Sequence, residues 1–514
     1  MHLRTRHVVA LILCASFASA TRKPSGCDYT AHKLTVDTSN GPIRGHTANN
    51  TGCVIEYLGI PYAKPLVGDL RLAPPQRFVA TDAYEAAEFG FDCPLTASKP
   101  VDYPGFTPQA QRIISYFASA AGTPQSEDCL TLNIWTKATV NANKADKPVL
   151  VFFYGGRFTI GNTHSPFYNA TEPHPSTKHE TDGSGSNYRL NVFGFPGAPG
   201  GPQNLGLRDQ RAAVEWSSGG VSVDYWAYAY REDPIAHGII AHSGNAFSFS
   251  QNTRSVQEAN WNTVVSAVNC SSVADTMACM RKVDWQAIES AAAAIKPSKS
   301  TSVLRSIPAF WPTPDNDIVF SDYVGLTAKG SLAKLPILFG STHNENGYYQ
   351  IPAFAQGITP TEDQISSFLF ESFICPVAYQ ATARRNHSVP PYAYRYFADW
   401  DNTRLYTTSD AYPGVDLHMV FGASADVSGL PNTADHRQLT KLMQKAWFCF
   451  SDGPSSGLSF KLGWPLYDPN GNTLIQLGLG NVPEAQFTYP SVYGSPCSTV
   501  TMGALGTAAA GNVV

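Results

Sequence analysis

The fold is decided by residues 149–156, which read Val149-Leu150-Val151-Phe152-Phe153-Tyr154-Gly155-Gly156. An unbroken apolar run leads through one tyrosine into a pair of glycines. Strands of parallel sheets have this continuous apolar character because helices cover both of their faces. In such sheets, ligand sites form in the loops that follow the carboxyl ends of the strands. The stretch therefore predicts an α/β protein with a site close to Gly155 and Gly156.

The rest of the chain repeats this alternation of apolar strands and amphipathic helices. Further strands are predicted at Gly238–Ala241, Pro336–Phe339 and Ala393–Phe397, and helices at Gln210–Trp216, Val223–Tyr230 and Gln438–Phe448. Strands that alternate with helices indicate a doubly wound sheet, so we expect a central, mostly parallel sheet flanked by helices. One segment does not fit. Residues 178–186 are polar and glycine-rich where another apolar strand is due, so we expect a core strand to be degraded there.

The N-terminus has the features of a secretory signal. Arg4 and Arg6 precede the apolar run Val8–Phe17, and Ala18-Ser19-Ala20 supplies a small-residue cleavage site. The run is too short to span a bilayer, and no later segment has transmembrane length. We therefore predict a signal peptide at 1–20, one globular domain at 21–500, a Gly/Ala-rich tail at 501–514, and secretion. The nearly balanced charge of −4 argues against nucleic acid as a partner.

Cysteine usage and glycosylation triplets fit an extracellular protein. Cys14 lies in the predicted signal, which leaves nine cysteines, so at least one cannot pair within the chain. The expected disulfides are Cys93–Cys129 and Cys270–Cys279. Asn-x-Ser/Thr triplets begin at Asn49, Asn169, Asn269 and Asn386. Metal-ligand clusters and dinucleotide fingerprints are absent from the sequence, so no cofactor is expected.

Several motifs together resemble the type-B carboxylesterases, the α/β-hydrolase family that includes cholinesterases and secreted fungal esterases and lipases. The motifs are Glu56–Ala63 with Arg71–Pro75, Ser126–Asn133, Asn187–Phe195 and Asn204–Arg211. The likeness extends from about Val36 to about Pro490. It implies an α/β-hydrolase fold and hydrolysis of a small-molecule or lipid ester through an acyl-serine, which needs a base, an orienting acid and oxyanion donors.

The resemblance implies that Ser217 is the nucleophile, because Ser217-Ser218-Gly219-Gly220 is similar to the family's Ser-Ala-Gly-Gly. Ser218 would then donate its N–H to the oxyanion. A nucleophile elbow requires a buried strand that ends in Gly-x before the serine. Here the helical stretch Asp209–Trp216 comes directly before Ser217, and Glu215 stands in place of the first glycine. About twenty residues of the family pattern, including the elbow strand, are missing.

The other parts of the predicted site match the family pattern to different degrees. The resemblance assigns the acid to Glu345, which follows the predicted strand Pro336–Phe339. It assigns the remaining oxyanion donors to Gly155 and Gly156, although Arg157 replaces a third glycine of that loop. Pro413 stands where the family has its histidine, and proline cannot accept a proton. His418 and His343 are the nearest substitutes. His418 is interpreted as part of a following helix.

These departures leave three interpretations open. The first is a secreted carboxylic ester hydrolase whose segments were altered by splicing or by an error in the predicted transcript. The second is a non-catalytic esterase-like binding protein, and the third is the product of a decayed gene. In each case we expect this chain to be impaired or inactive as an esterase, since the elbow strand and the base are missing. Gly453–Gly457 also satisfies Gly-x-Ser-x-Gly, but it follows a helical segment rather than a strand and is interpreted as a loop.

Overall fold

The computed structural model describes residues 34–48, 54–137, 148–169, 182–216, 223–296 and 303–502. The predicted signal peptide and most of the predicted tail lie outside these ranges, as do Ser217 and Ser218. In the described ranges, no helix combines the length and the apolar character needed to cross a bilayer.

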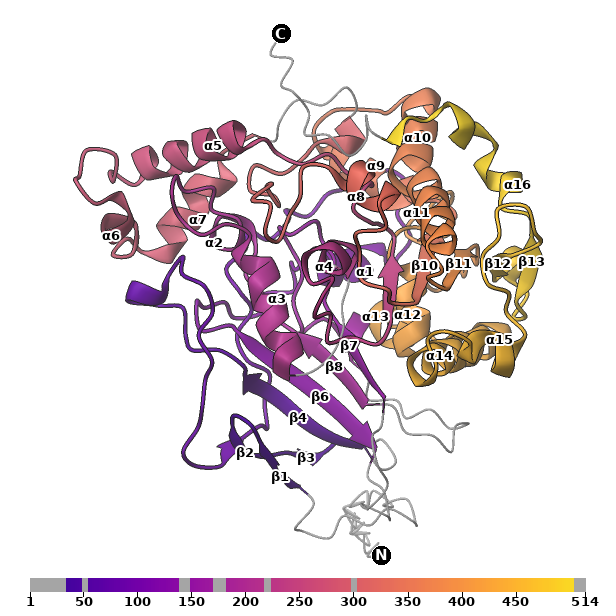
Figure 1. The fold of residues 1–514 in the computed structure, drawn as a ribbon, viewed down its shortest axis with the longest axis horizontal. Helices are drawn as coiled ribbons and strands as arrows, with labels where there is room; N and C mark the ends of the chain where they lie inside the picture. The colour runs from indigo at the N-terminus through magenta and orange to yellow at the C-terminus, as the bar shows by residue number, and fades with distance from the viewer. Residues whose placement is uncertain are drawn as a thin grey trace, which may run out of the picture.

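The strands form two separate five-stranded sheets and one small sheet. The first large sheet has the order β3-β4-β6-β8-β7, the second has the order β13-β12-β11-β10-β9, and the small sheet has the order β1-β2-β5. In Figure 1 the purple strands β4, β6, β8 and β7 lie side by side, and β10 to β13 form another group to their right. The strand bounds are β1 Thr35–Thr38, β2 Gly41–Arg44, β3 His46–Thr47, β4 Val54–Pro61, β5 Tyr84–Glu85, β6 Thr131–Lys137, β7 Val149–Phe152, β8 Asp182–Ser186, β9 Ile239–His242, β10 Ile337–Thr342, β11 Pro391–Tyr396, β12 Leu474–Leu477 and β13 Gln486–Thr488.

The apolar stretches singled out in the sequence are strands, which confirms the predicted α/β class. They form β7, β9, β10 and β11. Strands β9, β10, β11 and β12 run parallel to one another, as do β7 and β8, and β13 pairs with β12 in the antiparallel direction. The first sheet is otherwise antiparallel. The loops that carry the candidate site follow the carboxyl ends of parallel strands.

The helices lie between and around these strands. Helix α11 packs on β10 and β11, and α14 packs on α12. The predicted helices at Gln210–Trp216, Val223–Tyr230 and Gln438–Phe448 are confirmed as parts of α3, α4 and α14. The helix bounds are α1 Ala110–Phe117, α2 Asn191–Gly194, α3 Leu205–Trp216, α4 Val223–Ala229, α5 Arg254–Ala267, α6 Thr276–Met280, α7 Trp285–Ala293, α8 Tyr323–Ala328, α9 Asn346–Ala355, α10 Glu362–Leu369, α11 Cys375–Asn386, α12 Val415–Phe421, α13 Ser424–Ser428, α14 Ala434–Asp452, α15 Gly457–Leu462 and α16 Ser491–Gly494.

The prediction that residues 178–186 contain no strand is wrong for their second half. Residues 182–186 form β8, which pairs with β6 on one side and β7 on the other. Backbone hydrogen bonds to two partner strands define this strand, so its side chains need not have strand propensity. The side chains are nevertheless poor for a core position, because Ser186 is fully buried and its hydroxyl has no hydrogen-bond partner among the described residues.

The elbow strand that the resemblance requires is missing from the described part of the chain. Helix α3 ends at Trp216 and helix α4 begins at Val223, so six residues separate them. A strand of about five or six residues together with a loop and an elbow turn does not fit into that length. Consistent with this, β7 and β9 are the end strands of two different sheets. Among the described strands, each therefore lacks a neighbour along one edge.

Two buried ion pairs join the motifs that carry the family resemblance. Arg71 donates from Nε to Glu127 at 2.6 Å, and Arg189 donates from Nε to Asp209 at 2.7 Å, each through a two-pronged contact. Planar guanidinium–carboxylate pairs of this kind fix relative orientation as well as contributing energy. The first pair joins the motif Arg71–Pro75 to the motif Ser126–Asn133, and the second joins Asn187–Phe195 to α3. Arg71 Nη1 also donates to the carbonyl of Met280 at the end of α6.

Three disulfides join residues that the structure describes. Cys93–Cys129 and Cys270–Cys279 are bonded, as predicted, and Cys375–Cys497 is a third pair. Cys449 is buried and is the free cysteine of the described ranges. Cys27 and Cys53 lie outside them.

Candidate active site

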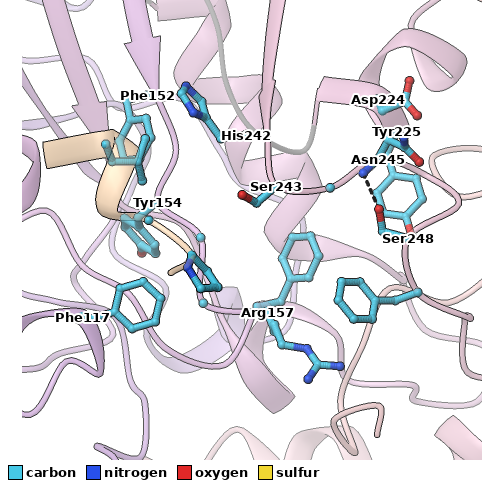
Figure 2. A pocket seen from close by; sticks show the side chains of 18 of the residues that line it. Phe117, Phe152, Tyr154, Arg157, Asp224, Tyr225, His242, Ser243, Asn245 and Ser248 are labelled. Atoms are coloured by element: carbon cyan, nitrogen blue, oxygen red, sulfur yellow. Dashed lines mark hydrogen bonds between the residues drawn. The ribbon is translucent and has the colours of Figure 1, made fainter. Parts of the chain in front are cut away.

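A cavity of about 180 Å³ lies at the ends of β7 and β9. Aromatic residues are the largest group in its wall, which also contains several polar and charged side chains. Figure 2 shows Tyr154 and Phe117 on one side, Ser243 near the centre, and Arg157 on the far side from His242. The lining residues are Phe117, Phe152, Tyr154, Gly155, Gly156, Arg157, Phe158, Tyr168, Tyr188, Asp224, Tyr225, His242, Ser243, Gly244, Asn245, Ala246, Ser248, Phe249, Trp311, Tyr349, Pro413, Gly414, Asp416 and Leu417.

The loop after β7 presents two free amides to this cavity. Gly155 and Gly156 both line it, and neither N–H donates a hydrogen bond to another described residue. Gly156 has a φ of +103°, and a β-carbon there would overlap the carbonyl oxygen of Ile160, so only glycine fits. Arg157 and Phe158 follow with φ of 54° and 56°, the left-handed region that side chains disfavour. The loop therefore places two glycine amides without a described hydrogen-bond partner beside the cavity, at the expense of backbone strain at Arg157 and Phe158.

Glu345 lies directly after β10 and is completely buried. Its Oε1 accepts hydrogen bonds from Ser243 Oγ and from the Thr342 amide, each at 2.7 Å. Its Oε2 accepts no hydrogen bond from any described residue. Burial raises the pKa of Glu345 to about 7, and the bonds from Thr342 and Ser243 oppose that rise. One oxygen of this carboxyl is thus held in place, and the other lacks a donor.

Pro413 occupies the wall of the same cavity as Ser243, the residue that bonds Glu345. The loop that carries Pro413 packs on the loop of the acid, because the Asn344 amide donates to the carbonyl of Ala411 at 3.0 Å. Pro413 thus lines the cavity, on a loop that contacts the loop of the acid. Proline supplies neither a proton acceptor nor an N–H for Glu345.

Neither substitute histidine lines the cavity. His418 belongs to α12, as predicted, is fully buried, and packs edge-on against Phe167 with ring centroids 4.2 Å apart. Burial and, to a smaller extent, the neighbouring His436 lower its pKa to about 3, against the opposing effect of Asp416. His343 packs its ring against Phe397. Burial also lowers its pKa.

The low pKa of buried His418 predicts how the stability of the protein changes at acidic pH. Its folded pKa of about 3 lies below the ordinary value of 6.5, so protons bind the unfolded chain more readily as the pH falls below 6.5. Between pH 7 and pH 5 the wild type should therefore lose about 2 kcal/mol more stability than His418→Leu. Urea unfolding at both pH values measures the difference. Equal losses in the two proteins would mean that His418 is hydrated in the fold.

A second polar cluster beside the cavity was not predicted from the sequence. His242 Nδ1 lies 3.1 Å from Asp416 Oδ2, and Tyr394 donates to the same carboxylate at 2.7 Å. Burial acts to raise the pKa of Asp416, but the bonds and charge of His242, together with Tyr394, outweigh it and hold that pKa below its ordinary value. The only signal in the sequence was His242-Ser243-Gly244 at the end of a predicted strand.

This cluster does not replace the missing base. Trp447 donates its indole N–H to His242 Nε2 at 3.2 Å. Because an indole nitrogen can only donate, Nε2 is the acceptor and Nδ1 carries the hydrogen toward Asp416. Both ring nitrogens of His242 are therefore engaged within the cluster, and neither is free to take a proton from a nucleophile in the cavity.

The structure thus describes the positions of some predicted site residues but not of others. Glu345 contacts the cavity wall through Ser243, and Gly155 and Gly156 lie in that wall. Ser217 and Ser218 fall outside the described residues, so their roles remain predictions.

The structure contains a sheet with parallel strands, a glycine turn after one strand and an acid after another. These are features of the α/β-hydrolases. The carboxylesterase family model matches residues 32–216 and 217–372, and the chain belongs to that family. The match is interrupted between Trp216 and Ser217, where the elbow strand is missing.

Known relatives match over most of their length. The chain is 29% identical to a chlorogenic acid esterase of Aspergillus niger, covering 94% of this chain and 93% of that protein. It is also 29% identical to secreted lipase 5 of Gibberella zeae, covering 95% and 97%. A mouse cholinesterase is 27% identical over 65% of this chain and 57% of its own length.

Proposed function

We propose that this chain is an extracellular member of the carboxylesterase family whose ester hydrolysis is lost or severely impaired. The observation that supports this proposal most directly concerns Glu345. This carboxyl is buried, its Oε2 has no hydrogen-bond partner among the described residues, and the neighbouring cavity is lined by Pro413. The unpartnered oxygen is the position from which an acid would orient a catalytic histidine. An oriented base is therefore the part of the machinery that this chain lacks.

The remaining parts support descent from an active serine esterase. The proposed roles are nucleophile for Ser217, orienting acid for Glu345, and oxyanion donors for Gly155, Gly156 and Ser218. In a working enzyme the base removes the serine proton as the oxygen attacks the ester carbonyl, and the amide donors stabilise the resulting oxyanion. Here the donors of the loop after β7 remain available, but no base activates the serine.

An extracellular location is supported by the three disulfides and by relatives whose names describe secreted lipases. Disulfides persist in oxidising compartments and are rare in the cytosol of most organisms.

Hydrolysis of p-nitrophenyl acetate tests the proposal. We expect purified protein and its Ser217→Ala variant to release p-nitrophenol at the same rate, because the hydroxyl of Ser217 is not activated. Absorbance at neutral pH measures both rates against buffer. A wild-type rate well above that of Ser217→Ala would show that the serine is activated by some other group and would contradict the proposal.

A non-catalytic binding role is the second candidate. The observation that favours it is a charged residue in the cavity wall that catalysis would not require, Arg157.

A further inference from the structure

Arg157 carries a positive charge into a cavity wall that is rich in aromatic side chains. Its guanidinium lies 4.5 Å from the ring centre of Phe249 and 5.6 Å from that of Tyr349. One nitrogen donates to the carbonyl of Ser306 at 2.5 Å, and Nε has no partner among the described residues. Stacking on aromatic faces stabilises a guanidinium but does not neutralise it. The side chain is therefore held in place with its charge uncompensated.

No described carboxylate forms an ion pair with Arg157. Burial lowers its pKa, and the neighbouring cation Arg305 lowers it further. Arg305 is itself paired with Glu371. A partly buried charge without a counter-ion is costly, so a bound anion at this position would relieve that cost.

The acidic residues of the cavity wall already have partners. Asp224 is bonded to Arg384 and to Gln380. Asp416 is bonded to His242 and Tyr394. Arg157 is thus the uncompensated charged side chain among the described lining residues, and a ligand that balances it must be negative.

We propose that this cavity binds an aromatic carboxylate, with Arg157 holding the carboxylate. A guanidinium matches the two oxygens of a carboxylate in one plane. The cavity of about 180 Å³ exceeds the roughly 150 Å³ that holds one benzene ring in an engineered apolar site. The aromatic wall, including Phe117, Phe152 and Trp311, supplies the apolar surface for the ring.

The inference rests on the proposed function in taking this cavity as the ligand site of an esterase fold. It does not require turnover. A ligand with a free carboxylate would be an acid released from an ester, or an ester that carries a second, uncleaved carboxylate. Both sources offer the same chemistry to Arg157.

Calorimetric titration with 3-phenylpropionate and its uncharged amide, 3-phenylpropionamide, tests the inference. At pH 7 the acid is ionised, so the two probes differ in charge while their rings are identical. We expect the wild type to bind the acid at least tenfold more tightly than the amide, the factor typical of one charge-assisted hydrogen-bond pair. In Arg157→Gln this preference should vanish, because glutamine keeps a polar side chain without the charge.

Arg211→Gln is the matched control. Arg211 also stacks on aromatic rings, with Tyr230 at 4.4 Å, but it lies outside the cavity wall and is paired with Glu215 and Asp233. Its substitution should leave the preference for the acid unchanged.

Three results would overturn the inference: equal binding of acid and amide by the wild type, no binding of the acid up to about 10 mM, or an undiminished preference in a folded Arg157→Gln variant. The wild-type comparison decides the matter even if Arg157→Gln does not fold. Since hydrolysis is not measured in this titration, esterase activity would contradict the proposed function alone, and the absence of an acid preference in the wild type would contradict this inference alone.

Discussion

A chain that carries both Pro413→His and a restored strand before Ser217 is expected to hydrolyse p-nitrophenyl acetate about four to six orders of magnitude faster than the unmodified chain. This is the range by which loss of the nucleophile or the base slows serine hydrolases. The strand is supplied by inserting the corresponding segment of the Aspergillus niger relative, ending in Gly-x, between Trp216 and Ser217. The new imidazole would meet the unpartnered Oε2 of Glu345, whose other oxygen is already fixed by Ser243.

Neither repair should suffice alone. Pro413→His supplies a base, but six residues between α3 and α4 cannot present Ser217 on an elbow. The insertion presents the serine but leaves it without a base. Because residues of a catalytic unit act together, each single repair should stay near the unmodified rate. The repaired chain with Ser217→Ala is the control for background hydrolysis. Full activity from Pro413→His alone would mean that the missing segment is not needed.

The strands with mostly apolar residues could be predicted from the sequence, whereas strand β8 could not. The runs that form β7, β9, β10 and β11 are rich in apolar and aromatic residues, so composition alone identifies them as strands, although only β10 and β11 are buried along their whole length. Residues 182–186 are small and polar, and they form a strand because β6 and β7 offer hydrogen-bond partners on both sides. Pairing of this kind depends on the neighbouring strands, which local propensity does not contain.

The site was predictable only where a motif is continuous in the sequence. Gly155 and Gly156 follow an apolar strand, and Glu345 follows another, so each could be placed at a strand end. Ser243 and the pair His242–Asp416 could not be predicted, since each contact joins residues more than a hundred positions apart. Such pairs become visible only when the sheet order is known. The charge on Arg157 was readable as a departure from the family loop, but its stacking on Phe249 was not.

The unpartnered oxygen of Glu345 should also make the protein lose stability as the pH rises. Burial raises the pKa of this carboxyl to about 7, against an ordinary value of 4.5, so the folded state binds its proton more tightly than the unfolded state. That contribution is fully present below about pH 4.5 and is lost as the pH rises through 7. The shift corresponds to about 3 kcal/mol.

Glu345→Gln isolates this effect, because glutamine mimics the protonated acid and keeps an oxygen for Ser243 and the Thr342 amide. Between pH 5 and pH 8 the wild type should lose about 2 to 3 kcal/mol of stability relative to this variant, as measured by urea unfolding at each pH. The histidines that titrate in the same range are common to both proteins and cancel. Parallel profiles would mean that the carboxyl is ionised and solvated in the fold. Pro413→His should reduce the difference, since an imidazole N–H can donate to Oε2 and stabilise the ionised form.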